Sequence, residues 1–466
     1  MWCRVVFFHR HSSGTTKKPM IDILALLQCF DPYLSKTTIR HMGVIIPAII
    51  TMTGRVTMRG RSRWTDKGGS YRTVQRFFQT KIFWPLLFWT FFKLHILNPD
   101  DNYLLAGDES VVTKAGKKTH GLDRFFSGLY GKAVPGIAFF TLSLISTRER
   151  ISYPTMTEQR VRSEAEKASA KSKAKKKKSK RGKPGRPKGS KNKDKTKVKL
   201  TGELKQIKIM VQKQLEIIND MISVKYLVLD GHFGNNNALQ MTRQCGLHLI
   251  SKLRNDSALY FSYDGIRNEK GAPRKYGDKI GYRNIPTQYL KESTFEDGIR
   301  TDIYQATMLH KAFAQALNVV IIVKTNRKTG KRGHVVLFSS DLELSFEQLI
   351  DYYRLRFQIE FNFRDAKQYW GLEDFMNVKE TAVTNAANLS LFMVNVSHLL
   401  LREFRKTSSQ DFGILDMKAH FRGRKYAEET LKLLPEMPET ILMEYIFDKI
   451  AQIGGIHTAE QGFSSP

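Results

Sequence analysis

Residues 350–375 read IDYYRLRFQIEFNFRDAKQYWGLEDF, and four polar side chains recur in this stretch at helical spacing. Tyr353, Arg356, Glu360 and Lys367 lie at offsets of 0, 3, 7 and 14 residues. On an uninterrupted α-helix, at about 100° per residue, they project into a stripe about 60° wide. One carboxylate among cations on a packed helix is suited to bind a metal ion beside phosphate groups. The spacing therefore predicts one continuous helix with Glu360 as a metal ligand.

The same four residues also allow a less specific interpretation. A solvated charged helix face commonly carries i,i+4 pairs, and Arg356 with Glu360 has the spacing of such a pair. Pairs of this kind are frequent on helices and imply no ligand. Features elsewhere in the chain have to decide between the two interpretations.

The spacing Y-x2-R-x3-E-x6-K resembles the motif of bacterial insertion-sequence transposases of the DDE type, a branch of the RNase H-like superfamily. The continuation Lys367–Phe375 and the segments Lys117–Gly121 and Phe125–Gly128 are also similar to that family. The resemblance spans roughly residues 100–405 and is much weaker before residue 95. It implies an α/β fold: an RNase H-like catalytic core of a mixed sheet with flanking helices, a mainly β insertion, and an N-terminal all-α domain.

Two aspartates follow apolar runs that are typical of buried strands. Asp108 comes shortly after Tyr103–Ala106, and Asp230 comes directly after Tyr226–Leu229. Runs without alternation favour central strands covered on both faces, and acids at the carboxyl ends of neighbouring strands converge. Each aspartate has an alternative as an ordinary turn acid, and Glu109 competes with Asp108.

The resemblance assigns Asp108, Asp230 and Glu360 as the catalytic acids, which also bind metal. Phosphodiester chemistry with two divalent ions requires clustered hard oxygen ligands, so we expect two Mg2+ or Mn2+ ions. Asp220 is a rival acid, but it lies in a helical pattern.

Several cations are expected to contact DNA. The resemblance implies that Tyr353, Arg356 and Lys367 bind the transposon terminus. Lys117, Lys118 and His120 follow the first acid and are further candidates, with ordinary surface charge as the alternative.

The charge of the chain points to a polyanionic partner. The formal net charge of the 466 residues is +32, and 17 Lys and Arg against one acid lie between residues 167 and 199. Arg181, Arg186 and Lys188 belong to this segment, in which Gly-Arg-Pro-Lys is similar to the core of an AT-hook that enters the narrow minor groove. A nonspecific polycation is the alternative.

Membrane and disulfide functions are not indicated. The three cysteines form no CxxC pair, which fits a reducing cytoplasm. The most apolar run, Ile82–Leu97, contains Pro85 and Lys93 and is shorter than a bilayer span. No signal peptide is apparent, so we expect a cytoplasmic protein of the bacterial nucleoid.

Turn-forming residues and shifts in composition predict the domain boundaries of the chain. Residues 1–19 form a disordered basic terminus, and residues 20–98 form a helical DNA-binding domain or, alternatively, a helical cap, with helices at Ile21–Phe30, Ser35–Gly54, Ser70–Gln79 and Ile82–Leu97. The core begins at 99–254 and includes a disordered arm at 155–200. A β-rich insertion follows at 255–342, then the last core helices at 343–405 and a C-terminal region at 406–466.

The expected function is that of an insertion-sequence transposase that binds terminal inverted repeats, cleaves double-stranded DNA at the element ends and joins the 3′ ends to a target. A synaptic homodimer follows from the family, whose members pair two ends. The resemblance implies that relatives which cut through a DNA hairpin hold a flipped base with a Trp in this insertion. Residues 255–340 contain no Trp, so Tyr260, Phe261 or Tyr263 would have to stack on such a base here. The alternatives are a nuclease without strand transfer and a non-catalytic architectural DNA-binding protein.

Overall fold

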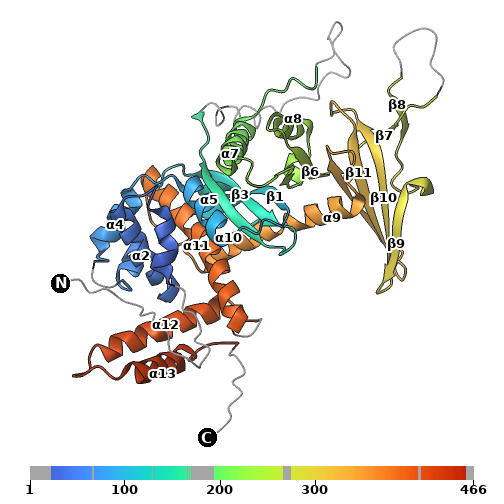
Figure 1. Cartoon of the computed structure of the whole chain (residues 1–466). Coiled ribbons are helices and arrows are strands. Elements are labelled where there is room, and N and C mark those ends of the chain that lie inside the picture. Colours follow the sequence, from blue (N-terminus) through green and yellow to red (C-terminus); the bar gives the residue numbers. More distant parts are fainter. Residues whose placement is uncertain are drawn as a thin grey trace. The chain divides into compact units, whose positions relative to one another are not determined.

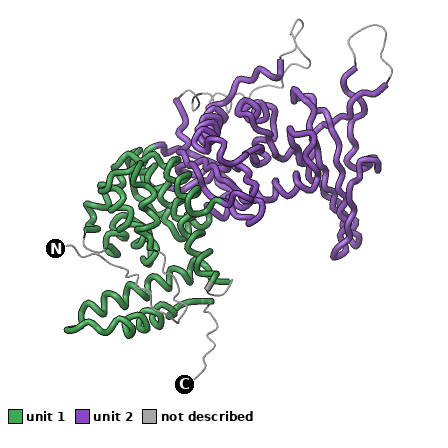
Figure 2. Tube along the Cα trace, in the orientation of Figure 1, with its two compact units in different colours: residues 1–97, 116–120, 363–466 green, residues 98–115, 121–362 purple. Residues whose placement is uncertain are grey.

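The computed structural model describes residues 22–457 except 66–67, 129, 165, 167, 169–193, 266–273 and 408–410. The chain divides into two compact units (Figure 2). The helical unit contains residues 1–97, 116–120 and 363–466, and the sheet unit contains residues 98–115 and 121–362. The expected basic terminus at 1–19 and the AT-hook-like residues Arg181, Arg186 and Lys188 lie outside the described residues.

The helical unit begins with short helices whose starts are set by hydroxyl side chains. Its N-terminal elements are α1 (Ile23–Leu27), a 3-10 turn (Gln28–Phe30), α2 (Lys36–Thr51), α3 (Met58–Ser62), α4 (Tyr71–Gln79) and α5 (Trp84–His95). Ser35, Thr57 and Ser70 each accept the backbone N–H three residues on, so they cap α2, α3 and α4. Helix α3 occupies a segment that the sequence analysis treated as a loop.

Three further helices complete the helical unit: α11 (Glu380–Thr407), α12 (Ile414–Leu431) and α13 (Thr440–Ala451). Its core is aromatic, because Phe30, Trp84, Phe88 and Phe91 all lie within 6.1 Å of the ring of Phe392 on α11, centroid to centroid. The run Ile82–Leu97 is therefore a buried helix, as expected.

Twelve strands of the described chain form one mixed sheet in the sheet unit. They are β1 (Tyr103–Thr113), β2 (Asp123–Ser127), β3 (Lys132–Ser146), β4 (Ser152–Arg160), β5 (Tyr226–Leu229), β6 (His248–Leu253), β7 (Leu259–Ser262), β8 (Tyr276–Lys279), β9 (Leu290–Glu296), β10 (Ile299–His310), β11 (Leu317–Asn326) and β12 (Arg332–Ser339). The main order is β2-β3-β1-β5-β6-β12-β11-β10-β7-β8, with β4 on β3 and β9 on β10.

The centre of this sheet is parallel. Strand β1 pairs in parallel with β5, and β5 pairs in parallel with β6, whereas β3 is antiparallel to β1. Helix α7 (Gly202–Ile218) packs on β3 and β4, and α8 (Asn236–Gln244) packs on β6 (Figure 1). The uninterrupted apolar run of β5 is explained by this position, since Leu227, Val228 and Leu229 are fully buried.

The expected β insertion continues the core sheet. Strand β12 pairs antiparallel with β6, which joins the strands after residue 255 to the parallel centre. Strands β7, β10, β11 and β12 coincide with strand-like runs of the sequence at Leu259–Tyr263, Thr301–Met308, Val319–Lys324 and His334–Ser339. Strands β8 and β9 were not expected, and residues 155–160, which were expected to lie in a disordered arm, belong to β4.

The helix expected across residues 350–375 is interrupted, so this prediction was wrong. Helix α9 (Phe346–Leu355) ends before Arg356, and α10 (Gln358–Gln368) starts two residues later. The N–H groups of Phe357, Ile359 and Glu360 each bond the carbonyl three residues back, which is the tighter 3-10 pattern. The angles computed for a uniform α-helix therefore do not apply across Arg356.

Candidate active site

Two of the expected acids lie on neighbouring parallel strands. The register of β1 with β5 ends at Gly107 opposite Leu229, so Asp108 and Asp230 occupy the next matching positions. Asp230 follows β5 and accepts the N–H of His232 at 3.2 Å, which forms a short turn. The sequence predicts that Asp108 ends its strand. This prediction was wrong, because β1 continues to Thr113.

Arg356 connects the first acid to the third. Its Nη1 donates to Oδ2 of Asp108 at 2.9 Å, and its Nη2 donates to Oε1 of Glu360 at 3.3 Å. The Arg356 side chain is 12% exposed, compared with 22% for Asp108 and 44% for Glu360. One cation therefore lies within reach of carboxylates from β1 and α10.

The elements around Arg356 are held to the antiparallel side of the sheet. The guanidinium of Arg150, in the turn after β3, makes two hydrogen bonds to Asp351 on α9, at 2.8 and 3.2 Å. The buried amide of Asn362, two residues after Glu360, donates to the hydroxyl of Ser152 on β4 at 2.8 Å. These contacts fix both helices that carry the motif.

The charge state of Asp108 reflects this crowding. Burial raises the pKa of the Asp108 carboxyl to about 6, against the lowering effect of the Arg356 guanidinium. The negative charges of Asp230 and Glu360 raise it further. All three acids therefore act on one another electrostatically at this edge of the sheet.

Arg356 and Tyr353 lie beside the acids. Although burial opposes it, the charge of Asp108 raises the pKa of the Arg356 guanidinium, which is protonated at every physiological pH. The buried Nε of Arg356 has no hydrogen-bond partner among the described residues. The guanidinium carbon lies 5.9 Å from the ring centre of Tyr353, and burial raises the pKa of that phenol.

The acids fit a hard divalent ion by their chemistry. Oxygens of Asp108 and Glu360 already bind a common cationic group, and their mutual repulsion favours an added positive charge. Within the described part of the chain, no three acid, His or Cys side chains are close enough to form a preassembled metal cluster. The carboxylate oxygens suit a hard divalent ion by their chemistry, while Arg356 bonds two of these carboxylates.

The other expected cations that the structure describes belong to the helical unit. Lys367 lies 3.4 Å from Glu373 between Nζ and Oε1, and Lys117 and Lys118 are exposed. The imidazole of His120 lies 3.8 Å from Glu380, and its backbone N–H donates to the carbonyl of Val378. The structure thus brings the acids, Tyr353 and Arg356 together in the sheet unit, and describes these other cations in the other unit.

One residue near the acids was missed in the sequence. Glu203, in the first turn of α7, lies 3.5 Å from His232 between Oε2 and Nε2, and this contact holds the pKa of the Glu203 carboxyl below its usual range. Burial and the charge of Glu203 raise the pKa of Glu109. Glu109 follows Asp108 on one strand, so the two carboxyls face opposite sides of the sheet. The only sign of Glu203 in the sequence is its position in the first turn of a helix, shortly after the N-cap Thr201.

In the described residues, no helix combines the length and apolarity required to cross a lipid bilayer.

Comparison with known proteins identifies the family of the chain. The family model described as DDE superfamily endonuclease matches residues 26–314, a range that contains Asp108 and Asp230 and stops before Tyr353. No curated protein matches the sequence. The matched domain and the mixed sheet confirm the expected α/β fold with an RNase H-like core. Because the match covers more than half of the chain, this protein belongs to the DDE superfamily endonuclease family.

Proposed function

We propose that this endonuclease is the transposase of a bacterial insertion sequence. It binds terminal inverted repeats in double-stranded DNA, cleaves at the element ends and joins the 3′ ends to a target. The observation that carries the proposal is the bridge of Arg356 between Asp108 and Glu360, with Asp230 in register beside Asp108. This arrangement supports Glu360, which lies outside the family match, as the third acid.

The acids are the proposed metal ligands. Asp108, Asp230 and Glu360 would hold two Mg2+ or Mn2+ ions, which supply activation of the attacking oxygen and stabilisation of the leaving oxygen. Arg356 neutralises two of these carboxylates in the metal-free protein. If these carboxylates had another cationic partner, the Arg356 guanidinium would be available to bind a DNA phosphate through two N–H groups.

Other groups are assigned to DNA by charge and exposure. Tyr353 and Lys367 bind the end of the element, with Lys117, Lys118 and His120 as further phosphate contacts. Arg181, Arg186 and Lys188 add affinity for A·T-rich DNA. The helical segment 20–98, whose Arg40, Arg59, Arg72 and Arg76 are exposed, contacts the ends, and two copies of the chain pair them at the bacterial nucleoid.

The test is metal-dependent cutting of labelled DNA that carries candidate ends, with Asp108→Asn, Asp230→Asn and Glu360→Gln. Each variant should bind DNA and fail to cut. The matched control is Asp256→Asn, which removes an exposed acid paired with Arg254 at 3.0 Å in the same unit. Cutting by a triad variant at the rate of the control would refute the assignment of that acid.

Strand joining distinguishes transposase from nuclease. Precut ends are incubated with a circular target, and joined products are measured. Cutting without joining would identify the protein as a nuclease that does not transpose. DNA binding without cutting in the unaltered protein would favour an architectural role.

A further inference from the structure

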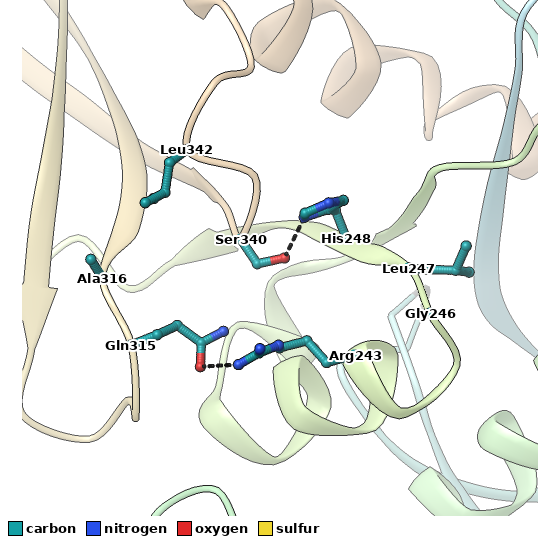
Figure 3. Close-up of a pocket in the computed structure, with 8 residues that line it drawn as sticks. All are labelled: Arg243, Gly246, Leu247, His248, Gln315, Ala316, Ser340 and Leu342. Carbon is teal, nitrogen blue, oxygen red and sulfur yellow. Dashed lines mark hydrogen bonds between the residues drawn. The ribbon is translucent and has the colours of Figure 1, made fainter.

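A pocket lies in the sheet unit at the end of β6 opposite the acids. It has a volume of about 390 Å³ and is lined by Arg243, Gly246, Leu247, His248, Gln315, Ala316, Ser340 and Leu342 (Figure 3). His248 begins β6 and pairs with Tyr226 at the start of β5, whereas Asp230 follows the end of β5. Four residues of a strand separate these two ends, which is about 13 Å. The pocket is therefore distinct from the candidate active site.

The hydrogen bonds of the pocket leave donors pointing at its space. Oε1 of Gln315 accepts from Gln240 Nε2 at 2.9 Å and from Arg243 Nη1 at 3.2 Å. These two bonds fix the orientation of the Gln315 amide, so its NH2 group remains a donor. Arg243 is exposed and uses one of its five N–H groups in this contact.

A contact with Ser340 orients the imidazole of His248. The Ser340 hydroxyl lies 3.4 Å from His248 Nδ1 and already accepts the backbone N–H of Leu249 at 3.1 Å. The Ser340 hydroxyl can donate its proton to Nδ1, and in this tautomer the imidazole carries its ring proton on Nε2. The imidazole then presents a second N–H donor on this side of the sheet.

No carboxylate is among the residues that line the pocket. The nearby acid Asp341 accepts the Tyr226 hydroxyl at 2.6 Å and the Glu343 N–H at 3.1 Å, so it is occupied by other donors. Leu247, Ala316 and Leu342 supply an apolar part of the wall. The chemistry of the lining is that of an anion site with room for an attached apolar group.

We propose that this pocket binds the phosphate of a nucleotide unit through Arg243, His248 and Gln315, with the sugar or base against Leu342 and Ala316. Its volume lies within the range of about 300–1,000 Å³ that is typical of small-molecule sites. The phosphate belongs either to a DNA strand away from the reacting bond or to a free nucleotide. Its assignment to a DNA strand rests on the proposed function, and its binding of phosphate does not.

The test uses the full-length protein without divalent ions, so that cutting cannot contribute. Three probes are compared: inorganic phosphate, deoxyadenosine 5′-monophosphate and a DNA duplex. Arg243→Met removes the guanidinium, and Ala316→Trp fills the space without a change in charge. Arg148→Met is the matched control, because Arg148 is exposed in the turn after β3 and removal of its side chain costs the same charge.

Arg243→Met should weaken mononucleotide binding about tenfold or more, as expected for a lost charge-assisted hydrogen bond. Ala316→Trp should do the same. If the phosphate is part of a DNA strand, Arg243→Met also lowers the slope of log affinity against log salt by about one. A loss confined to the mononucleotide identifies a free nucleotide as the ligand.

Equal behaviour of Arg243→Met, Ala316→Trp and Arg148→Met with all three probes would overturn the proposal. The result is independent of the acids, because Asp108→Asn leaves the pocket intact. A protein that fails to cut DNA but retains Arg243-dependent nucleotide binding would separate the failure of the proposed function from that of this site.

Discussion

Asn385 in the helical unit and Asp108 in the sheet unit are both polar side chains that connect distant parts of the sequence, but their surroundings differ. Asn385 is 1% exposed, and its amide donates to the carbonyls of Phe78 and Thr80 and accepts from Trp84 Nε1 at 2.8 Å. Asp108 has one cationic partner and a raised pKa. A satisfied buried group stabilises a fold, whereas a buried carboxyl with a raised pKa is typical of a site of chemistry.

The largest expected effect is on activity at Asp108. Asp108→Asn should lower metal-dependent cutting at least about a hundredfold, because the proposed metal ligand is lost. Because burial raises the pKa of Asp108 from 3.8 to about 6, ionisation of this carboxyl lowers stability as the pH rises through this window, and the cost is fully present above about pH 6. Without metal, the variant should therefore be at least as stable as the unaltered protein. Urea denaturation measures the stability, and the cutting assay measures the activity. A large loss of stability would show that Asp108, like Asn385, mainly stabilises the fold.

The opposite result is expected at the satisfied group. Asn385→Ala leaves the Trp84 indole N–H and the two carbonyls without their partner, which should destabilise the protein by about 2–4 kcal/mol. The remaining folded molecules should cut DNA normally. The exposed Gln79→Ala, on α4 of the same unit, is the control, and equal unfolding curves for the two variants would contradict this prediction.

Lys418 tests the comparison with a charged group inside the helical unit. Its Nζ donates to the carbonyl of Ile49 at 2.6 Å and lies 5.0 Å from the ring centre of Trp370. Burial lowers the pKa of Lys418 to about 7, so between this value and that of the unfolded chain the unfolded state binds more protons. Stability should therefore rise with pH in that window.

The Lys418→Met variant removes this titration. The difference in unfolding free energy between about pH 7 and about pH 9 should shrink by about 1–2 kcal/mol relative to the unaltered protein. Lys432→Met, at an exposed position paired with Glu429, should leave the pH dependence unchanged. If the unfolding free energy of Lys418→Met varied with pH as steeply as that of the unaltered protein, the amine of Lys418 would be charged in the folded state throughout this pH range.

The smallest effect is expected at an exposed ion pair. Arg55 is 72% exposed and contacts Asp374 at 3.2 Å, and Asp374 also accepts the N–H of Val56 at 2.9 Å. Arg55→Ala should cost less than about 1 kcal/mol, while Asp374→Ala should cost more because a backbone donor loses its partner. Equal losses in thermal or urea unfolding would show that the ion pair carries the whole contribution.

The elements with strong local signals were predictable from sequence. The apolar run of β5 and the Ser35 cap of α2 correspond to the structure. Strand β9 was missed because its residues are mostly exposed and polar, so only its pairing with β10 identifies it. The continuation of β1 beyond Asp108 was missed for a related reason, since polar residues follow the apolar run.

Sequence patterns nominated the residues of the candidate site but not their arrangement in space. Spacing identified Arg356 and Glu360 as partners, and their contact is present. The bond from Arg356 to Asp108 spans 248 residues, and local patterns contain no information on such a separation. The 3-10 turn that breaks the helix at Arg356 depends equally on tertiary contacts, because the residues there have no Pro or Gly to announce it.

Strand β6 has one further consequence, which concerns truncated forms of the protein. It pairs with β5 on one side and β12 on the other, and its Ser251 hydroxyl donates to the Asp230 carbonyl at 2.7 Å. Deletion of residues 255–342 would remove β12 and leave one side of β6 with unpaired backbone N–H and C=O groups. Such an edge promotes self-association through strand pairing. The added strands can therefore be elaborated or their hairpins shortened, but their loss would expose the backbone next to Asp230.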